Sequence, residues 1–289
     1  APFNPLGLRR AAYRPFIEML RAAMNHAGII RIDHILGVRR AFWVPDAGCS
    51  GGAPGGYVAY PQEALLALIR LEAQRAGCVV VGEDLGSVPP GLRDRLAEAG
   101  LLGCAVLQFE KEGARFHRPQ DYRPATLASF GTHDTPTLRG WWCGWDIDRR
   151  HAINGSGDAE REAEHGRRAE ERRALARLLR DEGLLPPGVD TEAPPETADD
   201  ALVAAIHELL ARAGSALVAV QLADALGSTA QQNLPGTVDE YPNWRRRYPV
   251  DSDALADALA AAPGLKALAA FVTPPKQPPA KQETQPCPQ

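Results

Sequence analysis

The sequence has no long apolar run, no paired cysteines and no excess of basic residues. None of its apolar runs approaches the roughly 18 residues of a membrane-spanning helix, which argues against a membrane partner. The five cysteines are an odd number without a Cys-x-x-Cys pair, so no metal site is indicated and free thiols in a reducing, cytoplasmic compartment fit better. The formal net charge of −4 gives no reason to expect nucleic acid as a partner.

The sequence also lacks an initiator Met, since it begins Ala1-Pro2-Phe3. It shows no signal sequence, but if the natural N-terminus lies upstream, that absence carries little weight. A chain of 289 residues with 45% hydrophobic content can bury a substantial core, in one large or two ordinary domains.

What the sequence does contain is three acidic motifs, each placed directly after a short apolar run. They are Arg31-Ile32-Asp33-His34, Gly82-Glu83-Asp84-Leu85-Gly86 and Gly131-Thr132-His133-Asp134. A short apolar run closed by glycine or polar residues predicts a buried parallel strand. Carboxylates at the carboxyl ends of such strands are where α/β barrels carry out their chemistry, and glycosidic bond chemistry needs two or three of them in one pocket.

Strand-like and helix-like segments alternate along the chain. Strands are predicted at about 28–30, 78–81, 103–109, 125–130 and 215–221, and helices at about 9–27, 63–76, 90–99, 157–183, 201–213 and 253–271. This alternation predicts an α/β protein with a parallel sheet. A TIM-type (β/α)8 barrel uses about 30 residues per unit, so about the last five strands would be present and three units would precede them.

Composition suggests how the rest of the chain is organised. We expect residues 1–272 to be the C-terminal part of a catalytic barrel, with a charged helical insertion at about 146–200. The Gly- and Pro-rich residues 45–61 predict a mobile loop that could act as a lid. The Pro-, Gln- and Lys-rich end, 273–289, predicts a disordered tail. Cys78 and Cys104 stand at predicted strand starts and are expected to be buried thiols.

Asp33 is the candidate nucleophile. Arg31 lies two residues before it, so both side chains are expected on one face of a strand, where the arginine favours the ionised carboxylate. An ionised carboxylate is what attack on an anomeric carbon requires. A purely structural Arg–Asp pair at a strand end is the alternative interpretation.

Glu83 is the candidate general acid and base. Its position after a strongly apolar strand predicts partial desolvation, which raises the pKa of a carboxyl group and keeps it protonated. The alternative is that Glu83 and Asp84 belong to the N-terminal cap of the helix after Pro90, a role that suits Asp84 better.

Asp134 and His133 form the third candidate group. The Asp134 carboxylate could grip sugar hydroxyls and stabilise an oxocarbenium-like transition state, while His133 donates to another hydroxyl. An ordinary turn is the alternative. Sugar faces stack on aromatic rings, so Trp43, Trp141, Trp142 and Trp145 are candidate stacking residues, or else core residues beneath a loop.

Taken together, these motifs resemble the amylomaltase (4-alpha-glucanotransferase, disproportionating enzyme) family, closest to its bacterial maltodextrin-system type. The acidic triad is shared with the wider alpha-amylase clan, whereas other stretches that agree are more specific. They are Gly56-Tyr57-Val58-Ala59-Tyr60-Pro61, Thr135-Pro136-Thr137-Leu138-Arg139-Gly140-Trp141-Trp142, Asn233-Leu234-Pro235-Gly236-Thr237 and Tyr241-Pro242-Asn243-Trp244-Arg245-Arg246. The likeness runs from the start to about residue 270.

The resemblance implies a retaining double displacement on alpha-1,4-glucans and maltooligosaccharides, without a metal or organic cofactor. By the family pattern Asp33 is the nucleophile, Glu83 the acid and base, and Asp134 the transition-state stabiliser. The substrate-binding residues implied are Arg31, His133, Trp43 and Asn233. A retaining mechanism would place the two catalytic carboxyl groups about 5–5.5 Å apart.

Two other functions stay open at this point. An alpha-glucan hydrolase of the same clan would use the same carboxylates, and an inactive fragment could still bind glucan. The family keeps some substrate contacts before the nucleophile strand, and an open sheet has exposed edges that invite aggregation. We therefore expect the isolated chain to be poorly active or unstable. The sequence does not indicate chain-length preference, cyclic products or oligomeric state.

Overall fold

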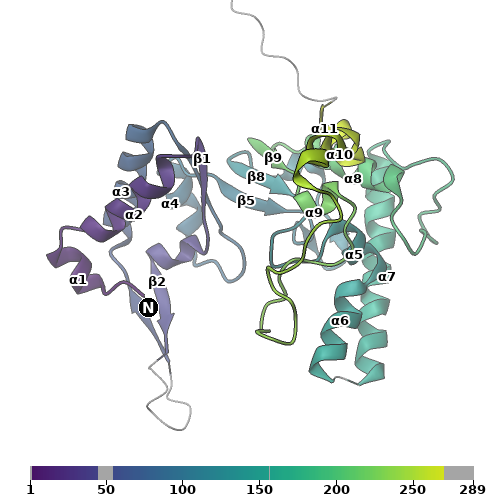
Figure 1. Ribbon diagram of the computed structural model, residues 1–289, viewed down its shortest axis with the longest axis horizontal. Coiled ribbons are helices and arrows are strands. Elements are labelled where there is room, and N and C mark those ends of the chain that lie inside the picture. The colour runs from purple at the N-terminus through teal and green to yellow at the C-terminus, as the bar shows by residue number, and fades with distance from the viewer. Residues whose placement is uncertain (1, 45–54, 156, 270–289) are drawn as a thin grey trace, which may run out of the picture.

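Five parallel strands form the centre of the computed structural model, which describes residues 2–44, 55–155 and 157–269 (Figure 1). They are β1 (Ile29–Ile32), β4 (Val79–Gly82), β5 (Gly103–Val106), β8 (Thr126–Ser129) and β9 (Leu217–Ala219). Their spatial order is β1-β4-β5-β8-β9, and a single parallel bridge, Val81 to Leu102, joins β4 to β5. These are the strands that the apolar runs predict, so the α/β class is confirmed.

Helices pack around this sheet in two lobes (Figure 1). The first lobe contains α1 (Pro5–Arg10), α2 (Arg14–Met24), α3 (Gln62–Ala76), α4 (Leu92–Glu98) and the 3-10 helix Ile35–Val38. The second contains α5 (Leu138–Cys143), α6 (Trp145–Asn154), α7 (Asp158–Asp181), α8 (Asp200–Ala211), α9 (Leu222–Ala225), α10 (Leu255–Ala261), α11 (Pro263–Ala269) and the 3-10 helices Pro119–Asp121 and Ser252–Ala254.

Two predicted helices are each broken in two. The helix expected at 9–27 becomes α1 and α2, because Ala12 and Tyr13 adopt left-handed backbone angles and Pro15 restarts the helix within its first turn. The helix expected at 253–271 divides at Ala262, which is extended before Pro263, as the residue before a proline prefers to be.

Two antiparallel hairpins were not predicted. The first pairs β2 (Arg40–Trp43) with β3 (Gly56–Ala59). Strand β3 lies within the segment 45–61 that was expected to be a loop, and residues 45–54 of that segment lie outside the described residues. The pair β6 (Lys111–Glu112) and β7 (Arg115–Phe116) follows β5, which ends earlier than expected. The predicted tail, 273–289, also lies outside the described residues.

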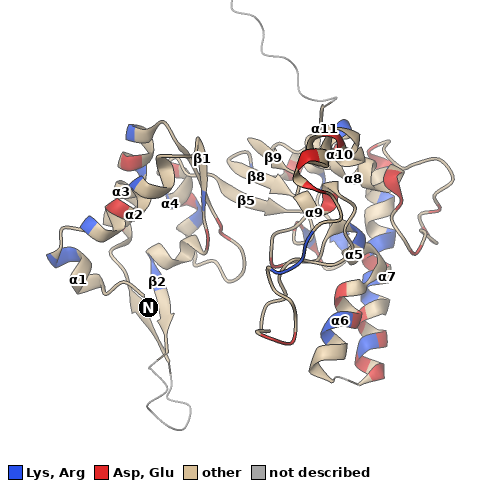
Figure 2. Cartoon of the chain, in the orientation of Figure 1, with Lys and Arg blue, Asp and Glu red and all other residues tan. Residues whose placement is uncertain are grey.

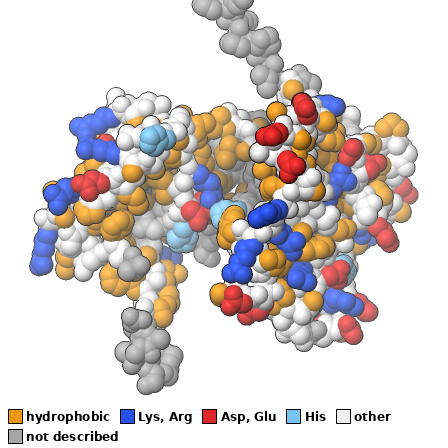
Figure 3. Space-filling view, in the orientation of Figure 1, with side chains coloured by type: hydrophobic (Ala, Val, Ile, Leu, Met, Phe, Trp, Pro, Cys, Tyr) orange, Lys and Arg blue, Asp and Glu red, His pale blue; other side chains and the backbone are white. Residues whose placement is uncertain are grey.

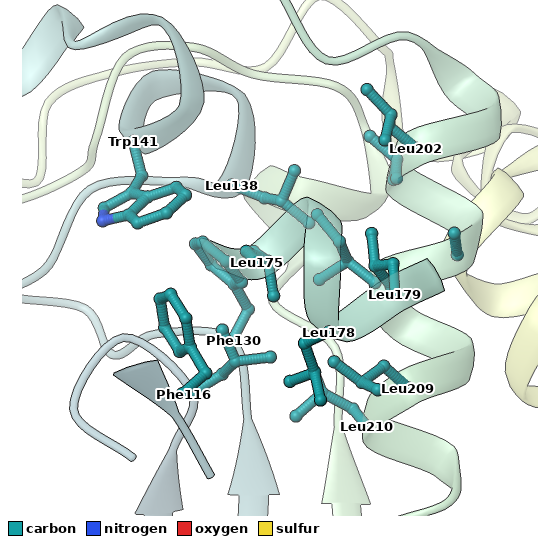
Figure 4. Packing of buried hydrophobic residues seen from close by; sticks show 14 of the residues in the cluster. Phe116, Phe130, Leu138, Trp141, Leu175, Leu178, Leu179, Leu202, Leu209 and Leu210 are labelled. Atoms are coloured by element: carbon teal, nitrogen blue, oxygen red, sulfur yellow. The ribbon is translucent and has the colours of Figure 1, made fainter. Parts of the chain in front are cut away.

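Each lobe has its own hydrophobic core. The first core gathers Leu20, Ile35, Ile69 and Leu92 from α2, α3, α4 and the 3-10 helix between them. The second is larger and packs α7 and α8 against β8, α5 and β7 (Figure 4); its residues include Phe116, Phe130, Leu138, Trp141, Leu175, Leu179, Leu202 and Leu210. A third, small cluster of Val81, Cys104 and Val106 lies between them, with Leu85, Leu102 and Leu127 packed against it.

Two further observations concern the thiols and the helices. Cys78 and Cys104 are buried free thiols, as the sequence predicts. Within the described ranges, no helix combines the length and the apolar character needed to cross a membrane.

Candidate active site

Asp33 and Glu83 follow neighbouring parallel strands at matching positions. Ile32, the last residue of β1, pairs with Gly82, the last residue of β4. The two carboxylates therefore leave the same edge of the sheet from adjacent strands, whose backbones are about 4.8 Å apart. The sequence separates these residues by fifty positions, and the parallel pairing brings them together.

Arg31 and Asp33 form the ion pair that the sequence predicts. The Nη1 atom of Arg31 donates to Oδ1 of Asp33 over 2.6 Å. The Asp33 side chain is 62% exposed, so the arginine orients an accessible carboxylate. This geometry fits a held nucleophile, and it also fits the structural pair that the sequence left open.

Glu83 is held by two backbone amides. Its Oε2 accepts a hydrogen bond from the amide of His34 over 2.9 Å, and its Oε1 accepts one from the amide of Leu85 over 2.7 Å. The side chain is half-buried. His34 reaches this position with a left-handed backbone, φ 47° and ψ 56°, an uncommon conformation for a residue with a side chain. The residue after the candidate nucleophile thus orients the candidate acid and base.

Asp84 has a structural role, but not the helix-capping role expected from the sequence. Helix α4 begins at Leu92 with Gly91 as its N-cap, and no side chain caps it. Asp84 is instead fully buried and accepts from Arg93 Nε over 3.1 Å and from the Cys104 amide over 2.7 Å.

A second arginine completes the environment of Asp84. Arg123 Nη2 lies 2.9 Å from Oδ2 of Asp84 and also donates to the carbonyl of Cys104. The carboxylate next to Glu83 therefore ties β4 to β5 and to the segment before β8, across the point where the ladder is a single bridge. Spacing along the chain does not predict this contact, because Arg123 is far from Asp84 in the sequence.

Asp134 lies beyond the end of β8 and is held from both sides. Its Oδ1 accepts from Nδ2 of Asn233 over 2.6 Å, and its Oδ2 lies 3.2 Å from Nε2 of His133. Asn233 comes from the long segment after β9, so the structure brings together three of the predicted site residues. The ring of Trp244, a residue not proposed for the site on its own, lies 5.6 Å from the His133 ring between centroids.

The aromatic candidates separate into core and surface residues. Trp141 and Trp142 are 2% and 0% exposed, so the expectation that they stack on sugar is wrong and the core alternative holds. Trp43 is half-buried and donates from Nε1 to the Tyr60 hydroxyl over 3.3 Å. Trp244 is 63% exposed and its ring lies beside that of His133; it was not a candidate from the sequence, because no predicted strand leads to it.

Two pockets border the third candidate group. One, of about 410 Å³, includes Asp134 with Phe109, Lys111 and Arg150, and the other, of about 220 Å³, includes His133 and Trp244. A larger recess of about 990 Å³ lies between the β6–β7 hairpin and α7. Mixed charge covers α6 and α7 in Figure 2, and Figure 3 shows basic, acidic and histidine side chains gathered where the two lobes meet.

The candidate residues thus form two groups at one edge of the sheet. Arg31, Asp33 and Glu83 follow β1 and β4, and His133, Asp134 and Asn233 follow β8 and β9, with β5 between them. Within the described part of the chain, no hydrogen bond or ion pair directly joins a carboxylate of one group to a carboxylate of the other. Such an edge can place a reactive carboxylate pair and a second charged pair around one ligand.

Comparison with known proteins gives consistent matches. The family model described as 4-alpha-glucanotransferase matches residues 1–252. The 4-alpha-glucanotransferases of Mycobacterium tuberculosis (strain H37Rv) and Haemophilus influenzae are 41% and 35% identical over 84% and 85% of this chain. The chain spans about a third of the length of these curated relatives, 33% and 35%.

Solved structures agree in fold. The crystal structure of amylomaltase from Corynebacterium glutamicum superimposes with a TM-score of 0.81 at 30% identity, over 91% of this chain and 39% of that one. An amylomaltase from Streptococcus agalactiae, solved in complex with acarbose, has a TM-score of 0.63 at 19% identity over 93% of this chain and 46% of its own, and so shares the fold.

Proposed function

The chain belongs to the 4-alpha-glucanotransferase family, and we propose that the complete protein containing it moves alpha-1,4-glucan segments between maltooligosaccharides. The observation that carries this proposal is the placement of Asp33 and Glu83 directly after paired residues of neighbouring parallel strands. Retaining glycoside chemistry needs two carboxyl groups about 5–5.5 Å apart, a separation that strands about 4.8 Å apart can supply.

In the first step Asp33 is the nucleophile. Its carboxylate forms a bond to the anomeric carbon of the donor glucan while the bond from that carbon to the leaving glucan oxygen breaks. The hydrogen bond from Arg31 orients this carboxylate. Glu83 gives its proton to the leaving oxygen, so the shortened glucan departs as a neutral alcohol.

In the second step the acceptor replaces the departed glucan. Glu83, now ionised, takes the proton of the acceptor 4-hydroxyl, and that oxygen attacks the anomeric carbon and releases Asp33. The backbone amides of His34 and Leu85 hold the Glu83 carboxylate at this stage, because each donates to one of its oxygens. The configuration at the anomeric carbon is retained after two inversions.

The second group of residues is proposed to bind the sugar. Asp134 would stabilise positive charge on the ring in the transition state, oriented by Asn233 and accompanied by His133. We propose Trp43 as a substrate-binding residue. We also propose that residues 1–272 are part of a TIM-type barrel with a helical insertion at about 146–200, which the five parallel strands support. We further propose that the protein acts in the cytoplasm, which the buried thiols support.

The test is product analysis. The complete protein is incubated with maltotriose, beside Glu83→Gln and, as a control, Glu98→Gln, which changes a glutamate exposed on α4. Glucose together with maltopentaose from wild type and Glu98→Gln only would support transfer. A net gain of reducing ends without longer products would indicate a hydrolase instead, and binding of maltooligosaccharide without any products would indicate a non-catalytic glucan-binding protein.

A further inference from the structure

Two loops that carry proposed site residues are joined by three hydrogen bonds, which we call the loop clamp. Oδ1 of Asp224 accepts from the amide of Leu138 over 2.6 Å. The hydroxyl of Thr137 donates to the carbonyl of Thr229 over 2.9 Å. The third is the contact of Asn233 with Asp134 described above. The first loop follows β8 and the second follows β9.

The base of the loop clamp is the pair of contacts made by Asp224 and Thr137, and its tip is the contact made by Asp134. The base is buried, since Asp224 is 3% exposed and Thr137 is 1% exposed, whereas Asp134 at the tip is exposed. Buried hydrogen bonds cost more to break than exposed ones, because the groups left behind lose water as well as their partner. The base therefore determines where the two loops lie, and the tip carries the charged group that faces the ligand.

The base is also tightly packed. A Cβ atom added to Gly140, in the first turn of α5, would lie 2.3 Å from the carbonyl oxygen of Thr229. The backbone of the second loop thus lies directly against helix α5. No side chain lies between these two backbones. A change in the Asp224–Leu138 contact therefore moves one loop relative to the other.

We propose that Asp224 is a positioning residue for glucan transfer, which aligns Asp134 with Asn233 by fixing the start of α5 to the segment after β9. This inference rests on the proposed function. Asp224 is buried and accepts from the first amide of α5. Asp134 lies four residues before that amide, and Asn233 lies nine residues after Asp224. No sequence pattern pairs Asp224 with Leu138, because the contact joins segments 86 residues apart along the chain.

A misplaced transition-state contact lowers kcat and leaves KM nearly unchanged. A displacement of about 1 Å can cost on the order of a hundred-fold in rate. For Asp224→Ala we therefore expect kcat for transfer from maltotriose to fall on the order of ten- to a hundred-fold, with a similar KM. Asp224→Asn keeps an oxygen that can accept from Leu138, so it should restore most of kcat.

The experiment uses the complete protein and a control for lost stability. Asp199 is the N-cap of α8, and its side chain accepts from the amide of Leu202 over 2.9 Å. Asp199→Ala removes this exposed helix cap and leaves the contacts of Asp224, Thr137 and Asn233 in place, so its kcat should stay at the wild-type value. Each variant is compared by kcat, KM and thermal midpoint.

A second pair of variants covers the case in which Asp224→Ala fails to fold. Thr137→Val removes the hydroxyl from the same base and keeps the shape of the side chain, while Thr137→Ser keeps the hydroxyl. Loss of kcat in Thr137→Val with recovery in Thr137→Ser would support the proposal. Equal kcat in Asp199→Ala, Asp224→Ala and Thr137→Val would overturn it. An inactive wild-type protein would count against the proposed function itself. That result differs from one in which the wild type is active and only the positioning role of Asp224 fails.

Discussion

The backbone amide of His34 donates a 2.9 Å hydrogen bond to Oε2 of Glu83. His34 directly follows Asp33, the proposed nucleophile. Its amide therefore connects Glu83, the proposed acid and base, to the backbone that carries Asp33. This connection requires a left-handed backbone at His34, which only glycine adopts without strain.

Substitutions at His34 should reveal that strain. His34→Gly and His34→Ala both remove the side chain and keep the amide that binds Glu83. Because left-handed angles cost an alanine on the order of 1 kcal/mol, His34→Gly should be more stable than His34→Ala by about that amount. Urea denaturation of the two variants measures the difference. A more stable alanine variant would show that the backbone is not left-handed here.

Asn233 should matter through its effect on Asp134. Asn233→Ala removes the 2.6 Å donor, so kcat for transfer should fall on the order of ten-fold with a small change in KM. Asn233→Asp should be worse, because two adjacent carboxylates repel each other. Steady-state assays with maltotriose check both, and Asn154→Asp, at an exposed asparagine of α6, serves as the control. Activity of Asn233→Asp above that of Asn233→Ala would contradict this role.

Asp84 should contribute to stability. Asp84→Ala leaves the Cys104 amide without its acceptor and two arginines without their common partner, so unfolding should become easier by on the order of 3 kcal/mol. Asp94→Ala, at an exposed position of α4, should change stability by less than about 0.5 kcal/mol. The midpoints of urea denaturation measure both effects, and similar midpoints for the two variants would remove the structural role assigned to Asp84.

Asp224 should make stability depend on pH. Burial raises the pKa of its carboxyl group from 3.8 to about 7, although the hydrogen bond from Leu138 acts in the opposite direction. Between about pH 4 and pH 7 the unfolded chain has released this proton and the folded chain still holds it, so stability falls as the pH rises through that window. The full effect is on the order of 4 kcal/mol, from about three pKa units.

Asp224→Asn should remove this part of the pH dependence. Its free energy of unfolding, measured by urea denaturation from pH 4 to pH 8, should fall less steeply than that of the wild type. Asp199→Asn changes an exposed aspartate and should keep the wild-type slope. Parallel curves for Asp224→Asn and the wild type would mean that Asp224 is ionised in the folded protein throughout.

The sequence predicts the five central strands because each is a short apolar run closed by polar residues. It does not predict the break at Ala12 and Tyr13, since left-handed angles at residues other than glycine leave little trace in composition. The hairpins were missed because their strands are not continuous apolar runs: β2 begins with Arg40, and β6 and β7 begin with Lys111 and Arg115.

The candidate site could be predicted only in part. The Arg31–Asp33 contact is local, so spacing alone suggests it. The contact of Asp84 with Arg123, and that of Asp224 with Leu138, join distant segments, and one sequence contains no pattern that pairs them. Trp141 and Trp142 look like ligand-binding residues in the sequence, but the packing of α7 and α8 buries them.

The single bridge between β4 and β5 affects the order in which the parts of the chain fold. Among the described residues, each lobe buries most of its apolar side chains in its own core, and the cluster between the lobes is small: three buried residues, with Leu85, Leu102 and Leu127 packed against them. Asp33 and Glu83 come together within one lobe, and Asp134 and Asn233 within the other. On refolding of the complete protein, the helical signal should therefore recover before the proposed transfer activity, because the two groups of candidate residues meet only when both lobes are packed together.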